Sequence, residues 1–432
     1  MWSFRAVAER IGAGVAILDR SSPRVTIVAG IMADVPRRSH DETRKFFPIR
    51  LQRATRGEIS GFRHDFPGGL GHHDDMMSMN YTLESIAATL VAEGKGILAA
   101  DETPATLTKR FETLGIQSTE QSRRSYREML FTAPGAAAYI SGVIMQDETI
   151  RQKTIGGTPL AQILSGQGIV PGIKVDTGAR PLAGSSGETV TEGLDGLRDR
   201  LAEYRGMGAR FAKWRAVIRI MDALPSPACV SANAHALARY AALCQEGGLV
   251  PIVEPEVLMD GSHTLERCAE VTGAVLHAVF HALFEQGVSL TSILLKPNMV
   301  IAGKECSRPA SVQEVAVATL SCLRRHVPAA VPGIVFLSGG QSDRLATAHL
   351  DAINRMPGPK PWKITFSYGR ALQDPALEGW HGRDENLAAG QRALAHRAWC
   401  NGAASLGTYT DEMEAKSPGA TNLVHRREWH DD

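Results

Sequence analysis

The sequence contains the stretch SILLKPNMV at residues 292–300. In it, the three aliphatic residues 293–295 are followed directly by Lys296 and Pro297. A short, wholly apolar run of this kind is typical of a strand that is buried on both faces of a parallel sheet. The sequence therefore predicts that Lys296 lies at the carboxyl end of a buried strand.

Seven further apolar runs have the same character, and several of them also end on polar or charged residues. Between the runs lie longer helical patterns, for example at 231–248, 263–286 and 311–326, and in the last of these Ser311 and Glu314 have the spacing of a capping box. The seven runs are GKGILAAD (94–101), AAYISGVIM (137–145), IVPGIKVD (169–176), ARFAKWR (209–215), LVPIVEPE (249–256), GIVFLSGG (333–340) and WKITFSYG (362–369).

Eight buried strands that alternate with helices predict an α/β protein, a closed (β/α)₈ TIM barrel. An open doubly wound sheet is less favoured, because no GxGxxG turn follows the first strand. The barrel is expected over residues 80–408, with an N-terminal extension at 1–79 and a C-terminal tail at 409–432.

The extension has no sustained helical or strand periodicity. Three interpretations of residues 1–76 stay open. The segment is a flexible, disordered appendage, or non-native sequence upstream of a true start at Met76, Met77 or Met79, or a targeting or regulatory segment. Neither a signal peptide nor a transit peptide fits it well.

The composition excludes several classes of protein. With 44% hydrophobic residues and a net charge of +1, the chain of 432 residues lacks the basic excess of a nucleic-acid binder. No stretch approaches the ~20 apolar residues that span a membrane. The six cysteines form no CxxC pair, so we expect buried, reduced thiols in a cytoplasmic protein.

Charged side chains gather where the predicted strands end, and this is the face of a TIM barrel that carries the active site. Several cations and several carboxylates on one rim indicate an anionic substrate and acid–base chemistry. Lys296 is the sharpest candidate, because burial favours the neutral amine and a neutral amine can form a Schiff base with a carbonyl. From this segment alone, a lysine that only reaches solvent or an ion pair is an equally good interpretation.

The ordered stretches ILAADET, GIKVD, FAKWR, PIVEPE, LLKPNMV, FLSGG and SYGRALQ resemble the signature segments of class I fructose-bisphosphate aldolase. The resemblance implies a carbon–carbon lyase of glycolysis and gluconeogenesis, usually a homotetramer, that uses no metal or cofactor. The enzyme cleaves fructose 1,6-bisphosphate reversibly to dihydroxyacetone phosphate and glyceraldehyde 3-phosphate.

The resemblance also implies a role for each catalytic candidate. Lys296 matches the Schiff-base lysine, and Glu254 the acid–base group that assists dehydration of the carbinolamine. Asp101 matches the aspartate that handles the proton of the C4 hydroxyl. Lys213 matches the lysine that supports charge changes beside the nucleophile, and Glu256 would hold this network in position.

Two phosphate sites are implied in the same way. The cradle for the C1 phosphate matches Ser338, Gly339, Gly369 and Arg370, and Arg110 matches a further arginine near that side. The C6 phosphate matches Lys174, Arg215, Thr103 and Thr106.

This chain departs from the family pattern at two places. Thr103 and Thr106 replace a serine pair, with Pro104 stiffening the loop between them. The chain also ends LVHRREWHDD, without the terminal tyrosine of many members.

Three alternatives remain beside this reading. A related barrel could act on fructose 1-phosphate or sedoheptulose bisphosphate. A scaffold could have kept the fold without activity. A metal-dependent aldolase would need histidines on the rim, but none of the 14 histidines falls at the predicted strand ends.

Overall fold

The computed structural model describes residues 82–416. The expectations for the N-terminal extension and for residues 417–432, including the end of the chain, lie outside the described residues.

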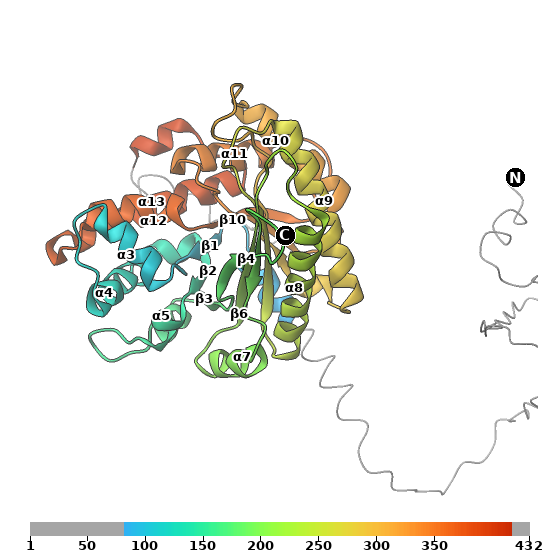
Figure 1. The fold of residues 1–432 in the computed structure, drawn as a ribbon. Coiled ribbons are helices and arrows are strands. Elements are labelled where there is room, and N and C mark those ends of the chain that lie inside the picture. The colour runs from blue at the N-terminus through green and yellow to red at the C-terminus, as the bar shows by residue number, and fades with distance from the viewer. Residues whose placement is uncertain (1–81, 417–432) are drawn as a thin grey trace, which may run out of the picture. The chain divides into compact units, whose positions relative to one another are not determined.

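Eight parallel strands close into a barrel in the order β1-β10-β9-β8-β7-β6-β3-β2 (Figure 1). This confirms the predicted fold, and each barrel strand falls within or overlaps one of the eight predicted runs. The barrel strands are β1 (Gly96–Ala99), β2 (Ile140–Met145), β3 (Val170–Lys174), β6 (Phe211–Ile218), β7 (Val250–Val257), β8 (Leu294–Leu295), β9 (Gly333–Phe336) and β10 (Lys363–Tyr368).

Helices follow the strands and cover the outside of the barrel (Figure 1). Ser311 caps the helix that begins at Val312, and the predicted capping box with Glu314 is present. The α-helices are α3 (Pro104–Glu112), α4 (Glu120–Phe131), α5 (Asp147–Arg151), α6 (Leu160–Gly166), α7 (Leu197–Gly206), α8 (Pro227–Glu246), α9 (Leu265–Glu285), α10 (Val312–His326), α11 (Asp343–Arg355), α12 (Arg370–Trp380) and α13 (Leu387–Ser405).

One element between β3 and β6 was not predicted. The strands β4 (Gly178–Pro181) and β5 (Thr189–Glu192) pair antiparallel as a hairpin outside the barrel. Thr191 joins it to the barrel, because its hydroxyl donates to the carbonyl of Arg215 at 2.8 Å.

A helical segment at 82–90 closes the amino end of the barrel. Leu83, Ala87 and Leu90 form one buried cluster with inward-facing strand residues such as Phe211 and Ile252. Val91, just after this segment, packs closely against Gly333, the first residue of β9. A methyl group on Gly333 would lie only 2.4 Å from Val91 Cγ1, so the close packing requires glycine there. With this end filled, the carboxyl end of the barrel is the one that stays open.

Two further expectations concern the thiols and the tail. Five of the six cysteines are buried as expected, but Cys306 is only partly buried because it lies in the exposed loop after β8. At the start of the expected tail, Tyr409 is buried and its hydroxyl donates to Glu414 at 2.8 Å. Within residues 82–416, no helix is both long and apolar enough to cross a membrane.

Close packing around Phe211 gives a test of the barrel interior. A methyl group on Gly172 would lie 2.2 Å from the Phe211 ring, so Gly172→Ala should overpack the core and lower the free energy of unfolding by roughly 1–3 kcal/mol. The free energy of unfolding can be measured by urea denaturation. Gly206→Ala is the matched control, because a methyl group there meets no atom within 4 Å.

The packing account also predicts a rescue. Replacing Phe211 by Leu in the Gly172→Ala background should recover part of the loss, since the smaller side chain leaves room for the methyl group. Wild-type stability of Gly172→Ala alone would contradict the packing.

Candidate active site

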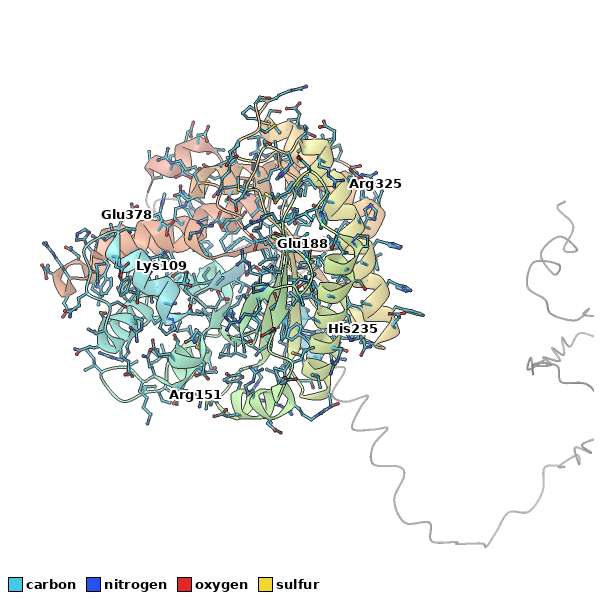
Figure 2. All side chains as sticks on the ribbon, in the orientation of Figure 1. Lys109, Arg151, Glu188, His235, Arg325 and Glu378 are labelled. Atoms are coloured by element: carbon cyan, nitrogen blue, oxygen red, sulfur yellow. The ribbon has the colours of Figure 1, made fainter. Side chains whose placement is uncertain are left out.

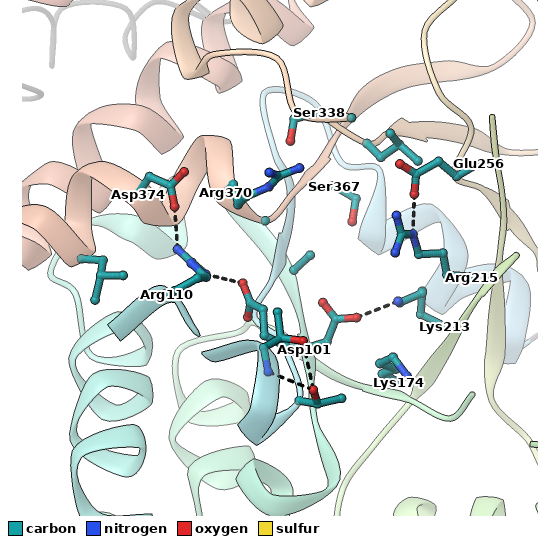
Figure 3. Close-up of a pocket in the computed structure, with 18 of the residues that line it drawn as sticks. Asp101, Arg110, Lys174, Lys213, Arg215, Glu256, Ser338, Ser367, Arg370 and Asp374 are labelled. Carbon is teal, nitrogen blue, oxygen red and sulfur yellow. Dashed lines mark hydrogen bonds and ion pairs between the residues drawn. The ribbon is translucent and has the colours of Figure 1, made fainter. Parts of the chain in front are cut away.

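A cavity of about 680 Å³ opens among the carboxyl ends of the barrel strands (Figure 3). Every residue that the sequence singled out for catalysis or phosphate binding lines it: Asp101, Thr103, Thr106, Arg110, Lys174, Lys213, Arg215, Glu254, Glu256, Lys296, Ser338, Gly339, Gly369 and Arg370. This volume is in the range of small-molecule sites.

The centre of the cavity is a connected set of four charges, of which Lys213, Glu254 and Lys296 are buried and Asp101 is 14% exposed. Lys213 Nζ lies 2.7 Å from Asp101 Oδ2 and 3.2 Å from Glu254 Oε2. Lys296 Nζ lies 3.2 Å from the other oxygen of the same glutamate, Oε1. Glu254 therefore bridges the two lysines.

Strand register brings these side chains together. Lys213 is on β6 and Glu254 on β7, and these strands pair along their whole length. Lys296 directly follows β8, where its N–H donates to the carbonyl of Val253 at 2.8 Å. Asp101 lies two residues beyond the end of β1.

The electrostatics of the set keep three of its groups charged. Burial raises the pKa of the Asp101 carboxyl, but Lys213 and Lys296 lower it more, so the net pKa is well below the ordinary value. The same balance of burial against these two lysines lowers the pKa of Glu254. Burial lowers the pKa of Lys213, but Asp101 and Glu254 raise it above the ordinary range.

Among residues 82–416, no hydrogen bond or ion pair joins Glu256 to Lys296 or Glu254. The Glu256 carboxylate pairs with Arg215 Nε, so any hold that it has on the lysine network acts through neighbouring groups. Lys174 is held in a similar way, with its Nζ 2.5 Å from Asp176 Oδ1. Both cations at this end of the cavity are thus oriented by buried carboxylates.

Thr103 and Thr106 lie at the start of α3, beside the central charges. The Thr103 hydroxyl is the N-cap of the helix and accepts from the N–H of Thr106 at 3.3 Å. Pro104 occupies the first helical turn, where its lack of an N–H costs nothing. The proline therefore fits the local structure and fixes the direction in which both hydroxyl groups leave the loop.

A glycine turn and a helix start form another part of the lining. Gly339 and Gly340 have φ angles of 60° and 83°, and within residues 82–416 neither N–H has a hydrogen-bond acceptor. The helix α12 begins at Arg370, with no side chain capping it. Free N–H groups beside a guanidinium are suited to an anion. Figure 3 shows Ser338 and Arg370 together, away from Lys174.

Ser367 is a lining residue that the sequence analysis missed. Its hydroxyl is buried without a hydrogen-bond partner among the described residues. It lies at the end of β10, in the SYG stretch, so its position at a strand end was the available signal.

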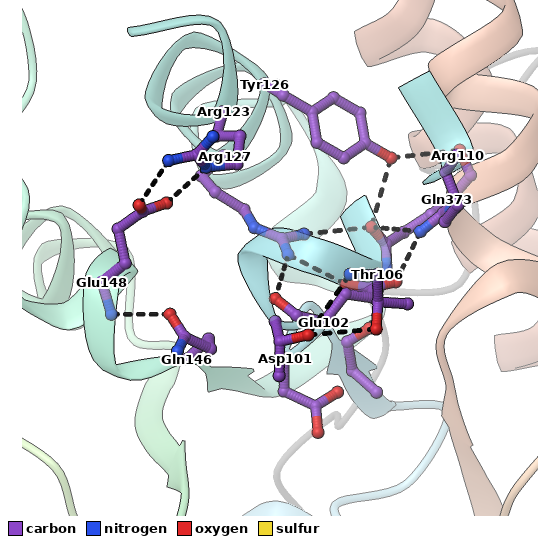
Figure 4. Close-up of polar contacts among 12 residues, drawn as sticks. Asp101, Glu102, Thr106, Arg110, Arg123, Tyr126, Arg127, Gln146, Glu148 and Gln373 are labelled. Carbon is purple, nitrogen blue, oxygen red and sulfur yellow. Dashed lines mark hydrogen bonds and ion pairs between the residues drawn. The ribbon is translucent and has the colours of Figure 1, made fainter. Parts of the chain in front are cut away.

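A polar network that starts in the cavity lining and continues behind it was also not predicted (Figure 4). The Glu102 carboxylate accepts from Arg110 at 2.5 Å, from Arg127 at 2.9 Å and from Gln373 at 2.9 Å. Arg110 also pairs with Asp374 Oδ1 at 2.7 Å. Arg110, on α3, is therefore held by two carboxylates, that of Glu102 before α3 and that of Asp374 on α12.

The outer rim of the cavity is polar, with Lys109 of α3 and Glu378 of α12 in its lining (Figure 2).

No histidine or cysteine is among the residues that line the cavity. In the described part of the chain, one group has atoms close enough to share a metal ion: His396, Cys400 and Glu414. Glu414 there accepts instead from Arg397 and Tyr409.

The buried charges predict a characteristic pH dependence. Lys213→Met leaves Asp101 buried without its nearest cation, which should cost about 3–5 kcal/mol of folding stability at pH 7. The lowered pKa values of the wild-type carboxylates stabilise the fold above about pH 4 and lose this effect as the pH falls. Burial is the largest influence on the pKa of Asp101 and raises it, so without Lys213 this pKa should rise and protonation should relieve the penalty.

The stability deficit of Lys213→Met should therefore be largest near pH 7–8 and shrink toward pH 5, as measured by thermal unfolding. Lys416→Met is the control, because its ion pair with Glu412 is exposed and contributes little. A deficit that is constant with pH would contradict the assignment of charges.

The chain is similar to proteins of one family. The family model "Fructose-bisphosphate aldolase class-I" matches residues 82–429. "Probable fructose-bisphosphate aldolase class 1" of Xanthomonas axonopodis pv. citri is 56% identical over 328 residues, covering 76% of this chain and 98% of the relative. "Fructose-bisphosphate aldolase 4, cytosolic" of Arabidopsis thaliana is 50% identical, covering 81% and 88%.

A solved structure agrees with these sequences. The aldolase of Plasmodium falciparum, in a complex with TRAP and a small-molecule inhibitor, has a TM-score of 0.76 and 48% identity, covering 77% of this chain and 96% of that one. From the barrel, the family match and these relatives together, the chain belongs to the class I fructose-bisphosphate aldolases, which are lyases.

Proposed function

We propose that the protein cleaves fructose 1,6-bisphosphate reversibly through a Schiff base on Lys296, in glycolysis and gluconeogenesis. The proposal is supported chiefly by the ion pairs that connect four side chains, Lys296, Glu254, Lys213 and Asp101. It places one amine, one carboxylate to accept its proton and a second carboxylate to act as base within a single buried site. A scaffold has no use for this set of charges, since each of the three buried ones costs several kcal/mol to desolvate.

The first step is formation of the iminium. Glu254 is anionic in the free protein and lies 3.2 Å from Lys296, so it can take the proton from the amine. The neutral amine then attacks the C2 ketone. Loss of the lysine charge removes one cation that lowers the pKa of Glu254, so this pKa rises and the carboxyl keeps the proton until it donates it to the hydroxyl that leaves the carbinolamine as water.

The second step is cleavage of the C3–C4 bond. Asp101, kept ionised by Lys213, takes the proton of the C4 hydroxyl, and C4 becomes the aldehyde carbon of glyceraldehyde 3-phosphate. The electrons of the broken bond flow to C3 and into the iminium, which becomes a neutral enamine. Protonation of C3 and hydrolysis then release dihydroxyacetone phosphate and restore Lys296.

The two ends of the cavity suit the two phosphates. We assign the C1 phosphate to Ser338, Gly339, Gly369 and Arg370, with Arg110 near that side. We assign binding of the C6 phosphate to Lys174, Arg215, Thr103 and Thr106. Cations at both ends of one cavity favour a bisphosphate over a monophosphate and hold the flexible substrate in a reactive pose.

We also propose that the enzyme works in the cytoplasm as a homotetramer, without a metal or organic cofactor. The location is supported by the name of the cytosolic Arabidopsis thaliana relative. The absence of a cofactor requirement follows from the chemistry, because the iminium itself is the electron sink.

Trapping the covalent adduct tests this proposal. Incubation with dihydroxyacetone phosphate followed by borohydride reduction should yield one adduct per chain, and peptide mass spectrometry should place it on Lys296. Lys296→Arg is the matched control and should give no adduct, because the guanidinium stays charged.

Cleavage of fructose 1,6-bisphosphate should be unaffected by EDTA and faster than cleavage of fructose 1-phosphate. A folded wild-type protein with no adduct, or one that EDTA inactivates, would refute the Schiff-base mechanism.

A further inference from the structure

The loop after β8 holds a lysine, Lys304, beside the turn of Gly339 and Gly340, and Gly339 lines the cavity. The N–H groups of Gly303, Lys304 and Glu305 donate to the carbonyls of His263, Met259 and Gly261 at 2.8, 2.8 and 3.0 Å. A methyl group on Gly303 would lie 2.1 Å from the Gly261 oxygen, so the close approach requires glycine. The backbone of Lys304 is therefore fixed against the loop that follows β7.

The side chain of Lys304 lies between two partners. Its Nζ is 3.0 Å from Asp260 Oδ1, in an ion pair whose side chains are 45% and 59% exposed. The same Nζ is also only 3.2 Å from the point where a Cβ on Gly340 would stand, and Arg370 Nη2 is 3.3 Å from that point. Two cationic groups thus lie beside the glycine turn whose N–H groups are free.

We propose that Lys304 is a further binding residue for the phosphate held by Ser338, Gly339 and Arg370. In the free enzyme its ammonium group pairs with Asp260, and on substrate binding it turns to the phosphate. This inference rests on the proposed function, because it concerns the C1 phosphate of the same substrate.

The exchange of partners is favourable for two reasons. A phosphate that carries nearly two negative charges attracts the ammonium more strongly than one exposed carboxylate does. The lysine is a flexible point charge on a long stem, so it can move while its backbone stays fixed. The exposed pair with Asp260 contributes little stability, so little is lost when it breaks.

Substitution of Lys304 should weaken the binding of every ligand that carries the C1 phosphate. The C1 phosphate is common to fructose 1,6-bisphosphate, fructose 1-phosphate and dihydroxyacetone phosphate. Lys304→Met should raise KM for both sugars by roughly tenfold, with a smaller change in kcat, and weaken the binding of dihydroxyacetone phosphate to a similar degree. Lys174→Met, at the other end of the cavity, should raise KM for the bisphosphate alone.

Asp260→Asn should change KM in the opposite direction. Removing the competing carboxylate frees Lys304, so KM for both sugars should fall by roughly twofold or more. Lys304→Arg should keep much of the wild-type KM. Lys363→Met removes an exposed lysine at the amino end of β10 and should leave KM unchanged, which controls for net charge.

For each variant, steady-state kinetics give KM and kcat for both sugars, and calorimetry gives the affinity for dihydroxyacetone phosphate. A wild-type KM in Lys304→Met would overturn the inference, as would a loss confined to the bisphosphate. If Lys304→Met and Asp260→Asn both raise KM and lower Tm alike, the pair is only structural. An inactive wild-type enzyme would instead refute the proposed function, so the two failures are distinguishable.

Discussion

The structure of the site depends on one buried interaction, the pairing of Lys213 with Asp101 and Glu254. Lys213 and Glu254 are almost fully removed from water and the Asp101 side chain is 14% exposed, and Lys296 joins them through Glu254. A single buried charge would be expelled or neutralised, but two lysines and two carboxylates compensate one another. Asp101, Glu254 and Lys213 are therefore held in their charged forms by their neighbours, and loss of one of these charges changes the pKa values of the other two.

The barrel is what makes this arrangement possible. The four charges come from four strands or strand ends, β1, β6, β7 and β8, and the last three of these are neighbours in the sheet. The helical segment at 82–90 fills the amino end, so the side chains at the carboxyl end have space for a ligand. Loops beyond the strands then add the outer groups, such as the glycine turn at Gly339 and the start of α12 at Arg370.

The sequence predicted the barrel and the central residues because both depend on local patterns. Apolar runs mark buried strands, and polar residues at their ends mark the open face of the barrel. The network of Glu102 with Arg127 and Gln373 could not be predicted in this way, because its members are distant in sequence and meet only through the packing of α3, α4 and α12.

The hairpin of β4 and β5 was missed for a different reason. Its strands are short and partly exposed, so they lack the apolar pattern that marked the barrel strands. The contact of Glu256 with Arg215 likewise follows from the register of β6 and β7, and spacing along the chain does not reveal it.

A crystal structure of the enzyme with fructose 1,6-bisphosphate would show whether Lys296 forms the Schiff base. We expect continuous electron density from Lys296 Nζ to C2 of the sugar, with Glu254 and Asp101 beside the bond and one phosphate on the turn at Gly339. A sugar bound in the cavity without a link to Lys296, or with neither phosphate on that turn, would contradict this expectation.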